Sequence, residues 1–183
     1  GGTLAAANLT VRVLSVNDLP VNNNVPSSKT TTEDTAIVFS TANNNAISIS
    51  DNDALNDSSV ILTTTISIGN GKGTLNAVTS SGATITGNGS TTVQIQGTVT
   101  QINAALDGLT YTPTANANGN AYTTITIATN DGTVTDTDTI TVNITAADDK
   151  PVANSMAATV GVGSSQLFSY FQPNFIDAEG DSP

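Results

Sequence analysis

Short runs of alternating apolar and polar residues recur along most of this 183-residue chain. In the run ITVNI (140–144), Ile140, Val142 and Ile144 share one parity, while Thr141 and Asn143 take the other. Because successive side chains of a strand point to opposite faces, this period favours strands that bury one face and expose the other. The same pattern predicts strands at 9–16, 37–39, 47–50, 60–68, 91–97, 109–111 and 125–127.

Turn signals separate these predicted strands. Asn, Gly and Asp residues, which tolerate a positive φ angle, cluster at 70–73, 81–82, 87–89 and 130–132. Many short strands at regular spacing are typical of two packed antiparallel sheets. The sequence therefore predicts an all-β fold, an antiparallel β-sandwich with one core between its sheets.

One stretch, TVTQINAALDGLTYTP (98–113), departs from the strand period. Here Val99, Ile102, Ala105 and Leu106 recur at helical spacing. A threonine near the start can cap the first turn, and Gly108 stands where a helix would stop. We expect one short helix at about 100–107, crossing one end of the sandwich.

Two segments of the chain match each other. LTVRVLSVNDLPV (9–21) aligns with ITVNITAADDKPV (140–152) when Pro20 and Pro151 coincide, which gives an internal repeat of 131 residues (151 − 20). We expect three pieces: the last strand of a preceding repeat at 1–18, one complete repeat at 19–149, and the truncated start of the next at 150–183.

The acidic net charge and the absence of His and Cys exclude several partners and several kinds of active site. Four Lys and Arg stand against fifteen Asp and Glu, a formal net charge of −11, and the cations Arg12, Lys29, Lys72 and Lys150 are scattered singly. Nucleic acid and anionic membranes are gripped by clustered cations, so neither is an expected partner, and no apolar run in the sequence approaches the ~20 residues of a membrane helix. Without His or Cys, a Ser-His-Asp site, a His-ligated zinc ion and a thiolate nucleophile are impossible.

The acidic residues gather at predicted strand ends and at the repeat junctions. Carboxylates that lie together without an adjacent Lys or Arg repel each other unless a counter-charge or water relieves them. Calcium takes ~6–8 oxygen ligands from carboxylates, carbonyls and Asn side chains. We therefore expect Ca²⁺ as the cofactor, with candidate ligands Asn17, Asp18, Glu33, Asp34, Asp51, Asp53, Asp136, Asp138, Asp148, Asp149, Asp177 and Glu179.

These residues also have a simpler interpretation. Acidic residues commonly form turns or protect edge strands while facing water. We assign Asp57, Asp107 and Asp131 to that role. The recurrence favours calcium for the remainder: FIDAEGD (175–181) repeats the D-x-(D/E) group, with Asp177 and Glu179 matching Asp51 and Asp53.

Five pieces of the chain, in this order, resemble the cadherin-like tandem repeats of large bacterial surface proteins and RTX-type adhesins. They are VNDLPV (16–21), EDTA (33–36), ISDNDA (49–54), QINAALDGLTYTPTANANG (101–119) and TNDGTVTDTDTITVNITA (129–146). The resemblance spans essentially all of 9–155. It implies an extracellular Ig/cadherin-like β-sandwich on a bacterial cell surface, with calcium in the linkers between copies and a role in adhesion or as a spacer stalk.

The resemblance also implies where the ligands lie. Asn17, Asp18, Asp148 and Asp149 match the junction acids, Glu33 and Asp34 the acidic pair before the first strand, and Asp51 and Asp53 the D-x-D group. Two departures from the family pattern count against full calcium occupancy at the second junction. Lys150 lies inside that linker, and ATVGVGSS (158–165) stands where the third repeat would carry E-D-T.

The leading prediction is a structural and adhesive module and not an enzyme, with neighbouring repeats and a host or biofilm surface glycan or protein as partners. Strand complementation between copies, through 4–16 and 152–178, is a further possibility. Paired carboxylates can hydrolyse glycosides, but here they repeat at domain ends, and a Lys–Asn crosslink has only loop lysines to draw on. The alternative is a carbohydrate-binding module that presents some of Phe39, Tyr111, Tyr122, Phe168, Tyr170, Phe171 and Phe175.

Overall fold

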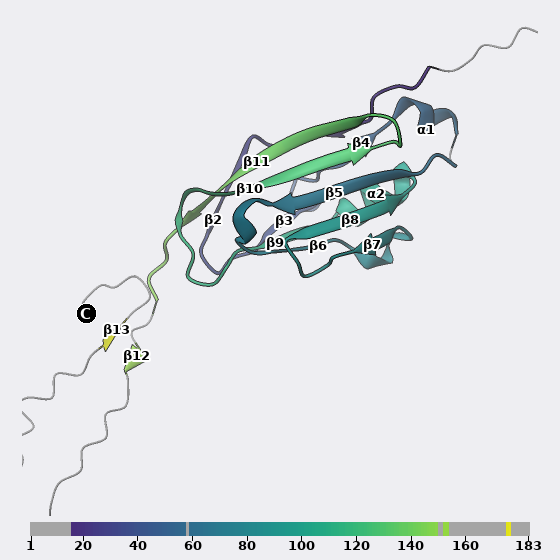
Figure 1. Ribbon diagram of the computed structural model, residues 1–183. Coiled ribbons are helices and arrows are strands. Elements are labelled where there is room, and N and C mark those ends of the chain that lie inside the picture. The colour runs from purple at the N-terminus through teal and green to yellow at the C-terminus, as the bar shows by residue number, and fades with distance from the viewer. Residues whose placement is uncertain (1–15, 58, 150–151, 154–174, 177–183) are drawn as a thin grey trace, which may run out of the picture.

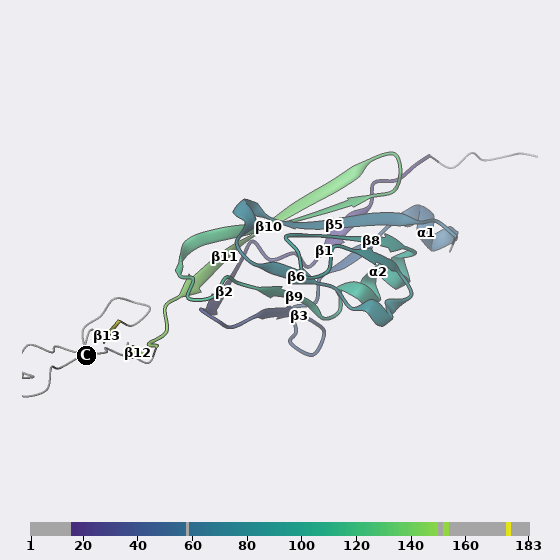
Figure 2. The ribbon, with the colours of Figure 1, turned by 60° about the horizontal axis from the view of Figure 1, so that its bottom comes forward.

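Two facing sheets enclose one apolar core in the computed structural model, which describes residues 16–57, 59–149, 152–153 and 175–176 (Figures 1 and 2). The larger sheet has the strand order β2–β11–β10–β5–β8–β7 and the smaller one the order β3–β9–β6. The strands of the larger sheet are β2 (Ser28–Thr32), β11 (Thr135–Thr145), β10 (Gly119–Asn130), β5 (Leu62–Ile68), β8 (Thr92–Gly97) and β7 (Thr84–Thr86). Those of the smaller sheet are β3 (Ile37–Phe39), β9 (Leu109–Thr112) and β6 (Thr74–Asn76).

The all-β sandwich predicted from the alternating pattern is confirmed. On β5, every second residue from Leu62 to Ile68 is buried, and Ile66 lies opposite both Ile127 of β10 and Val93 of β8. Aliphatic side chains from both sheets therefore meet in one core. Its fully buried members include Phe39, Ile47, Leu62, Leu75, Ile95, Ile102, Leu109, Tyr111, Ile125, Ile140 and Val142.

The sheet is not wholly antiparallel, because β2 joins β11 in parallel with Ser28 opposite Thr141 and Thr32 opposite Thr145. Hydrogen bonds from Thr141 N to Ser27 O (3.0 Å) and from Glu33 N to Thr145 O (2.9 Å) extend this pairing at both ends. The sequence pattern missed β2 because SKTTT holds no apolar residue. Strand β1 (Val21–Asn23) pairs with β4 (Ser48–Ser50) as a separate two-stranded ribbon.

The predicted short helix is present as α2 (Val99–Leu106), shifted by one residue. Thr98 Oγ1 accepts from Gln101 N (3.3 Å) while Gln101 Oε1 accepts from Thr98 N (3.0 Å), which forms a capping box. Ile102, Ala105 and Leu106 are buried against the core. A second helix, α1 (Asn52–Asn56), and two short 3₁₀ turns, η1 (Gly69–Gly71) and η2 (Thr79–Ser81), were not predicted.

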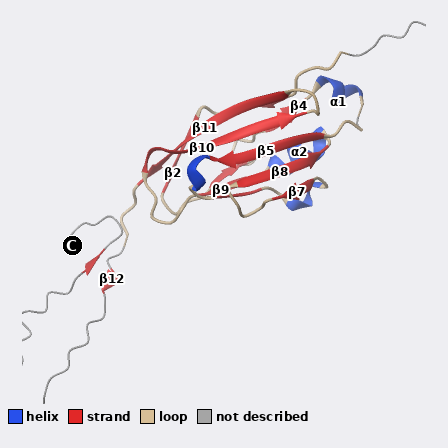
Figure 3. Cartoon of the chain, in the orientation of Figure 1, coloured by secondary structure: helices blue, strands red, loops and turns tan. Residues whose placement is uncertain are grey.

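Acidic residues occupy the two ends of the elongated sandwich. Helix α1 lies at one end, and β12 (Val152–Ala153) with β13 (Phe175–Ile176) lies beyond the other (Figures 1 and 3). We call the first end the entry pole; its polar residues are Asn17, Asp18, Asp51, Asn52, Asp53 and Asp131. We call the second the exit pole, with Glu33, Asp34, Asn116, Asp148 and Asp149.

Candidate metal sites at the two poles

Asp51 at the entry pole carries a buried carboxylate oxygen without a partner. The residue follows β4 directly and caps α1, with Asp51 Oδ1 accepting from Ala54 N (3.0 Å). The side chain is only 3% exposed, and Oδ2 accepts no hydrogen bond. A buried charge that is half satisfied is costly unless a cation or another donor completes it.

The chain entering the domain is tied to this same corner. Asp18 N donates to Asp53 Oδ2 (2.9 Å), and Asn52 Nδ2 donates to Asp18 Oδ2 (2.8 Å). Asn17 Nδ2 donates to Asp131 Oδ2 (2.8 Å) across the tip of the β10–β11 hairpin. The structure thus brings Asp18 against the D-x-D group and Asn17 against the neighbouring hairpin turn.

Asp136 and Asp138 of β11 have a different environment from the acidic residues of the entry pole. Asp136 Oδ2 accepts from Asn22 N (2.7 Å), and Asp138 Oδ2 accepts from Asn22 Nδ2 (3.2 Å). Asn22 is buried and its Oδ1 accepts from Thr129 Oγ1 (2.7 Å), which contacts Thr64 Oγ1 (3.0 Å). These two carboxylates anchor β1 to the large sheet, so their hydrogen bonds have a structural purpose without a metal ion.

Glu33 repeats the half-satisfied arrangement at the exit pole. Its side chain is 4% exposed, Oε1 accepts a short hydrogen bond from Ala147 N, and Oε2 is buried without a partner. Its backbone N–H extends the β2–β11 pairing, so the strand register fixes where this carboxylate lies. Each pole therefore holds one buried carboxylate oxygen that lacks a hydrogen-bond donor.

Asn116 joins two acidic residues at the exit pole and was not among the predicted ligands. Its backbone N–H donates to Asp34 Oδ1 (3.0 Å), and both residues adopt left-handed φ angles of 53° and 56°. Its side-chain amide faces Asp34 Oδ2 at 3.3 Å and Asp149 Oδ2 at 3.2 Å. In the sequence, Asn116 is one of two Asn residues in TPTANANG (112–119), and an Asn in such a loop is equally typical of an ordinary turn.

Three predicted ligands remain. Asp148 is exposed beside Asp149, and Asp177 and Glu179 lie outside the described residues. Within the described ranges, no three His, Cys, Asp or Glu side chains gather closely enough to hold a metal ion by themselves. A cation at either pole would need amide or backbone oxygens in addition to carboxylates, which are ligands that calcium accepts.

The structure supports the turn-forming role expected for Asp57 and Asp131. Asp57 accepts from Ser59 Oγ (2.6 Å) and Ser59 N (2.9 Å), and these bonds lower the pKa of its carboxyl, the hydroxyl contributing most. Asp131 Oδ1 accepts from Thr133 N (2.7 Å) and Val134 N (2.9 Å) within its hairpin turn. Desolvation raises the pKa of Asp131, but the bonds from Val134, Asn17 and Thr133 outweigh it, and the net change lowers the pKa.

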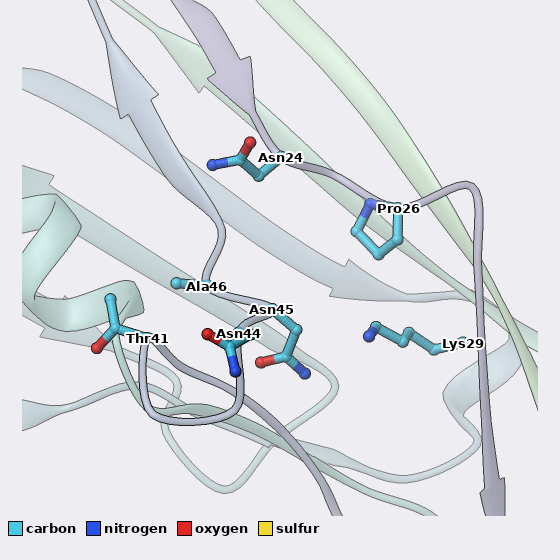
Figure 4. Close-up of a pocket in the computed structure, with 7 residues that line it drawn as sticks. All are labelled: Asn24, Pro26, Lys29, Thr41, Asn44, Asn45 and Ala46. Atoms are coloured by element: carbon cyan, nitrogen blue, oxygen red, sulfur yellow. The ribbon is translucent and has the colours of Figure 1, made fainter.

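A cleft of about 500 Å³ opens between β2 and the loop after β3, and no acidic residue lines it among those described (Figure 4). Lys29 reaches into it from β2 toward the loop that carries Asn44 and Asn45. Asn45 serves that loop, since its Oδ1 accepts from Ser40 N (2.8 Å) and its Nδ2 donates to Val38 O (3.0 Å). The complete lining is Asn24, Pro26, Lys29, Thr41, Asn44, Asn45 and Ala46, which includes no aromatic ring for a sugar to stack on.

The aromatic side chains of Phe39, Tyr111 and Tyr122 lie in the core or at its border. Phe39 and Tyr111 are fully buried, and the Tyr111 hydroxyl donates to Lys72 O (2.7 Å). Tyr122 packs against the core while the Lys72 ammonium lies 4.3 Å from its ring centroid. No helix among the described residues is long and apolar enough to cross a membrane.

Comparison with known proteins yields a single distant structural likeness to report. No protein-family model matches the chain, and no curated protein matches it either. The chain is similar to the surface layer protein SbsC, domains 1–6, with 14% sequence identity and a TM-score of 0.28. The match covers 94% of this chain but only 18% of the SbsC chain.

Proposed function

We propose that this chain is a calcium-binding structural module of a large bacterial cell-surface protein, in which Ca²⁺ stiffens the junctions between tandem cadherin-like repeats. One observation carries the proposal. Asp18 and Asp149 occupy the same position of the repeat (149 − 18 = 131), yet they contact opposite poles. Asp18 bonds to Asn52 and Asp53 at the entry pole, whereas Asp149 faces Asn116 at the exit pole.

A linker between two copies would make both sets of contacts at once. The preceding domain would supply Glu33, Asp34 and Asn116, and the following domain would supply Asp51 and Asp53. The linker acids would lie between them. The buried oxygens of Glu33 and Asp51 that lack donors would then face one shared, strongly acidic junction. Calcium fits this donor set, because all of its members are oxygens and Ca²⁺ accepts ~6–8 of them in flexible geometry, while Mg²⁺ demands a near-ideal octahedron.

A strand pairing beyond the exit pole supports the tandem arrangement. In the complete domain, β1 pairs with β4 through Val21 opposite Ser50 and Asn22 opposite Ile49. After the second linker, β12 pairs with β13 through Val152 opposite Ile176 and Ala153 opposite Phe175. Val152 is the repeat counterpart of Val21, so this pairing is the one expected if a further repeat starts here, and Asp177 follows Ile176 in sequence as Asp51 follows Ser50.

The proposal is tested by thermal unfolding of the whole chain in calcium, in magnesium and in a chelator. An ion that binds only the folded state, at ~100 times its dissociation constant, stabilises by ~2.7 kcal/mol. We expect a rise in Tm that is specific to calcium, and we expect it to shrink in Glu33→Gln and in Asp51→Asn. Asp107→Asn is the matched control, because the Asp107 side chain accepts from Thr41 N and Thr41 Oγ1 and belongs to neither pole.

An unchanged Tm across all three conditions would contradict the calcium assignment. The carbohydrate-binding alternative gains no comparable support from the described residues, since the side cleft has no aromatic lining and Phe39 and Tyr111 are buried. The sequence resemblance supports the proposed surface location and the proposed role in adhesion. The contacts of Asp18 and Asp149 support the proposal that neighbouring repeats bind at the poles.

A further inference from the structure

The side-chain amide of Asn116 faces two carboxylates, so its orientation decides whether it donates hydrogen bonds to them or adds a third oxygen beside them. One atom of this amide is 3.3 Å from Asp34 Oδ2 and 3.2 Å from Asp149 Oδ2. If that atom is the nitrogen, it donates a hydrogen bond to each carboxylate. If it is the oxygen, three oxygen atoms face one another, and only a cation between them makes the arrangement favourable.

The rest of the residue is held still while the amide can turn. The backbone N–H of Asn116 is bonded to Asp34 Oδ1 (3.0 Å), so the loop stays attached to the carboxylate in either orientation. A half turn about the last side-chain bond exchanges the two amide atoms and moves nothing else. The side chain is exposed, so no packing opposes the turn.

We propose that Asn116 is a ligand that changes its role with the cation. Without calcium, its nitrogen bridges Asp34 and Asp149 and holds the linker against the exit pole. With calcium, its oxygen turns inward and joins both carboxylates in binding the ion. This inference rests on the proposed calcium site at the exit pole and adds a consequence: chelation leaves the linker attached, so the junction softens without coming apart.

Substitution of Asn116 separates the two roles. Asn116→Asp keeps the size and tolerates the left-handed backbone, but it loses the donor and adds a charged ligand. We expect its Tm in chelator to fall by about 3 °C and its calcium affinity to rise about tenfold, because calcium affinity follows ligand charge. Asn116→Gly keeps the backbone conformation and removes both roles, so both quantities should fall. Asn118→Asp, exposed in the same loop, is the charge-matched control and should change neither.

A spectroscopic readout addresses the turn itself. The side-chain amide resonances of Asn116 should shift when calcium replaces chelator, as the hydrogen bonds to the two carboxylates are exchanged for solvent, while those of Asn118 stay in place. If calcium stabilises the wild-type chain but Asn116→Asp leaves both affinity and chelated Tm unchanged, the inference is wrong and the proposed function stands. If calcium does not bind the wild-type chain, the proposed function fails and this inference fails with it.

Discussion

At the scale of single residues, the two carboxylates buried at the poles are the most informative feature. In each, a backbone N–H donates to one oxygen, while the other, Glu33 Oε2 or Asp51 Oδ2, has no hydrogen-bond donor among the described residues. The first oxygen fixes the side chain in place, and the second keeps it available to an incoming charge. Under the proposed function, such an arrangement would lower stability in the absence of a cation and would increase the stabilisation that a bound cation provides.

Glu33→Gln tests both effects, the stability of the chain without a cation and its stabilisation by calcium. The amide keeps an oxygen for the Ala147 N–H and removes a buried negative charge, so we expect stability in chelator to rise by about 1 kcal/mol. Stabilisation by calcium should fall, because the exit pole loses a charged ligand. Chemical denaturation in chelator and in calcium measures both. A variant that loses stability in both buffers would show that Glu33 is an ordinary structural acceptor.

Tyr111 gives a prediction for alkaline pH. Burial, and to a smaller extent the charge of Tyr122, raise the pKa of Tyr111 from 10.0 to about 12. Above pH 10 the unfolded chain loses this proton while the folded chain keeps it, so the unfolded state binds fewer protons and stability falls as pH rises. We expect a loss of at most about 2 kcal/mol by pH 12, where the folded-state proton is half lost and solvent screening reduces the effect further. Denaturation of wild type and Tyr111→Phe from pH 9 to 12 checks this, and equal slopes for the two proteins would refute it.

At the scale of elements, one helix residue holds a strand that leads into the entry pole. Asn103 of α2 accepts from Ile49 N (2.7 Å) through Oδ1 and donates to Ile49 O (3.0 Å) through Nδ2. Ile49 lies in the middle of β4 and is 2% exposed, so water cannot replace these two bonds. The position of Asp51, two residues further on, therefore depends on α2.

Asn103→Leu leaves both backbone groups of Ile49 without partners. We expect a loss of about 2–4 kcal/mol in chelator, since a buried group left unpaired costs ~1–3 kcal/mol. Stabilisation by calcium should fall as well, because Asp51 is displaced. Ala104→Leu, on an exposed position of the same helix, is the control. A calcium effect that survives in Asn103→Leu would mean that β4 does not position the entry-pole ligand.

The elements that sequence reasoning found and missed differ in a physical way. Helix α2 was predictable because its capping box and its apolar residues agree on one local structure. Helix α1 was not, because its five residues show no period, although its N-cap Asp51 had been singled out for another reason. Strand β2 was missed because its place is set by parallel pairing with β11 and not by apolar side chains.

The candidate sites divide in the same manner. Local sequence placed Glu33, Asp34, Asp51 and Asp53 near strand ends, where the structure has them. It could not show that Asp136 and Asp138 accept hydrogen bonds from Asn22, because these bonds join residues more than a hundred positions apart. Asn116 was missed for the corresponding reason: only the fold brings it to Asp34 and Asp149.

At the scale of the whole molecule, the two poles lie at opposite ends of a single core. We expect their contributions to calcium stabilisation to add, because sites this far apart with no shared partners usually do so within ~0.5 kcal/mol. Glu33→Gln and Asp51→Asn should each remove one part, and the double variant should remove the sum. Melting of all four proteins over a calcium series tests this. A double variant no worse than either single variant would place both residues in one site.

The parallel pairing of β2 with β11 has a mechanical consequence. Both strands run from the entry pole toward the exit pole, and the chain enters through β1 and β2 and leaves through β11. Tension along a string of such domains would slide the two strands lengthwise past each other. Their evenly spaced hydrogen bonds would then carry the load together and would not open one after another. The Glu33 backbone extends the β2–β11 pairing, and its side chain lies at the exit pole. An ion bound there would therefore stabilise the end of the strand pair that resists stretching.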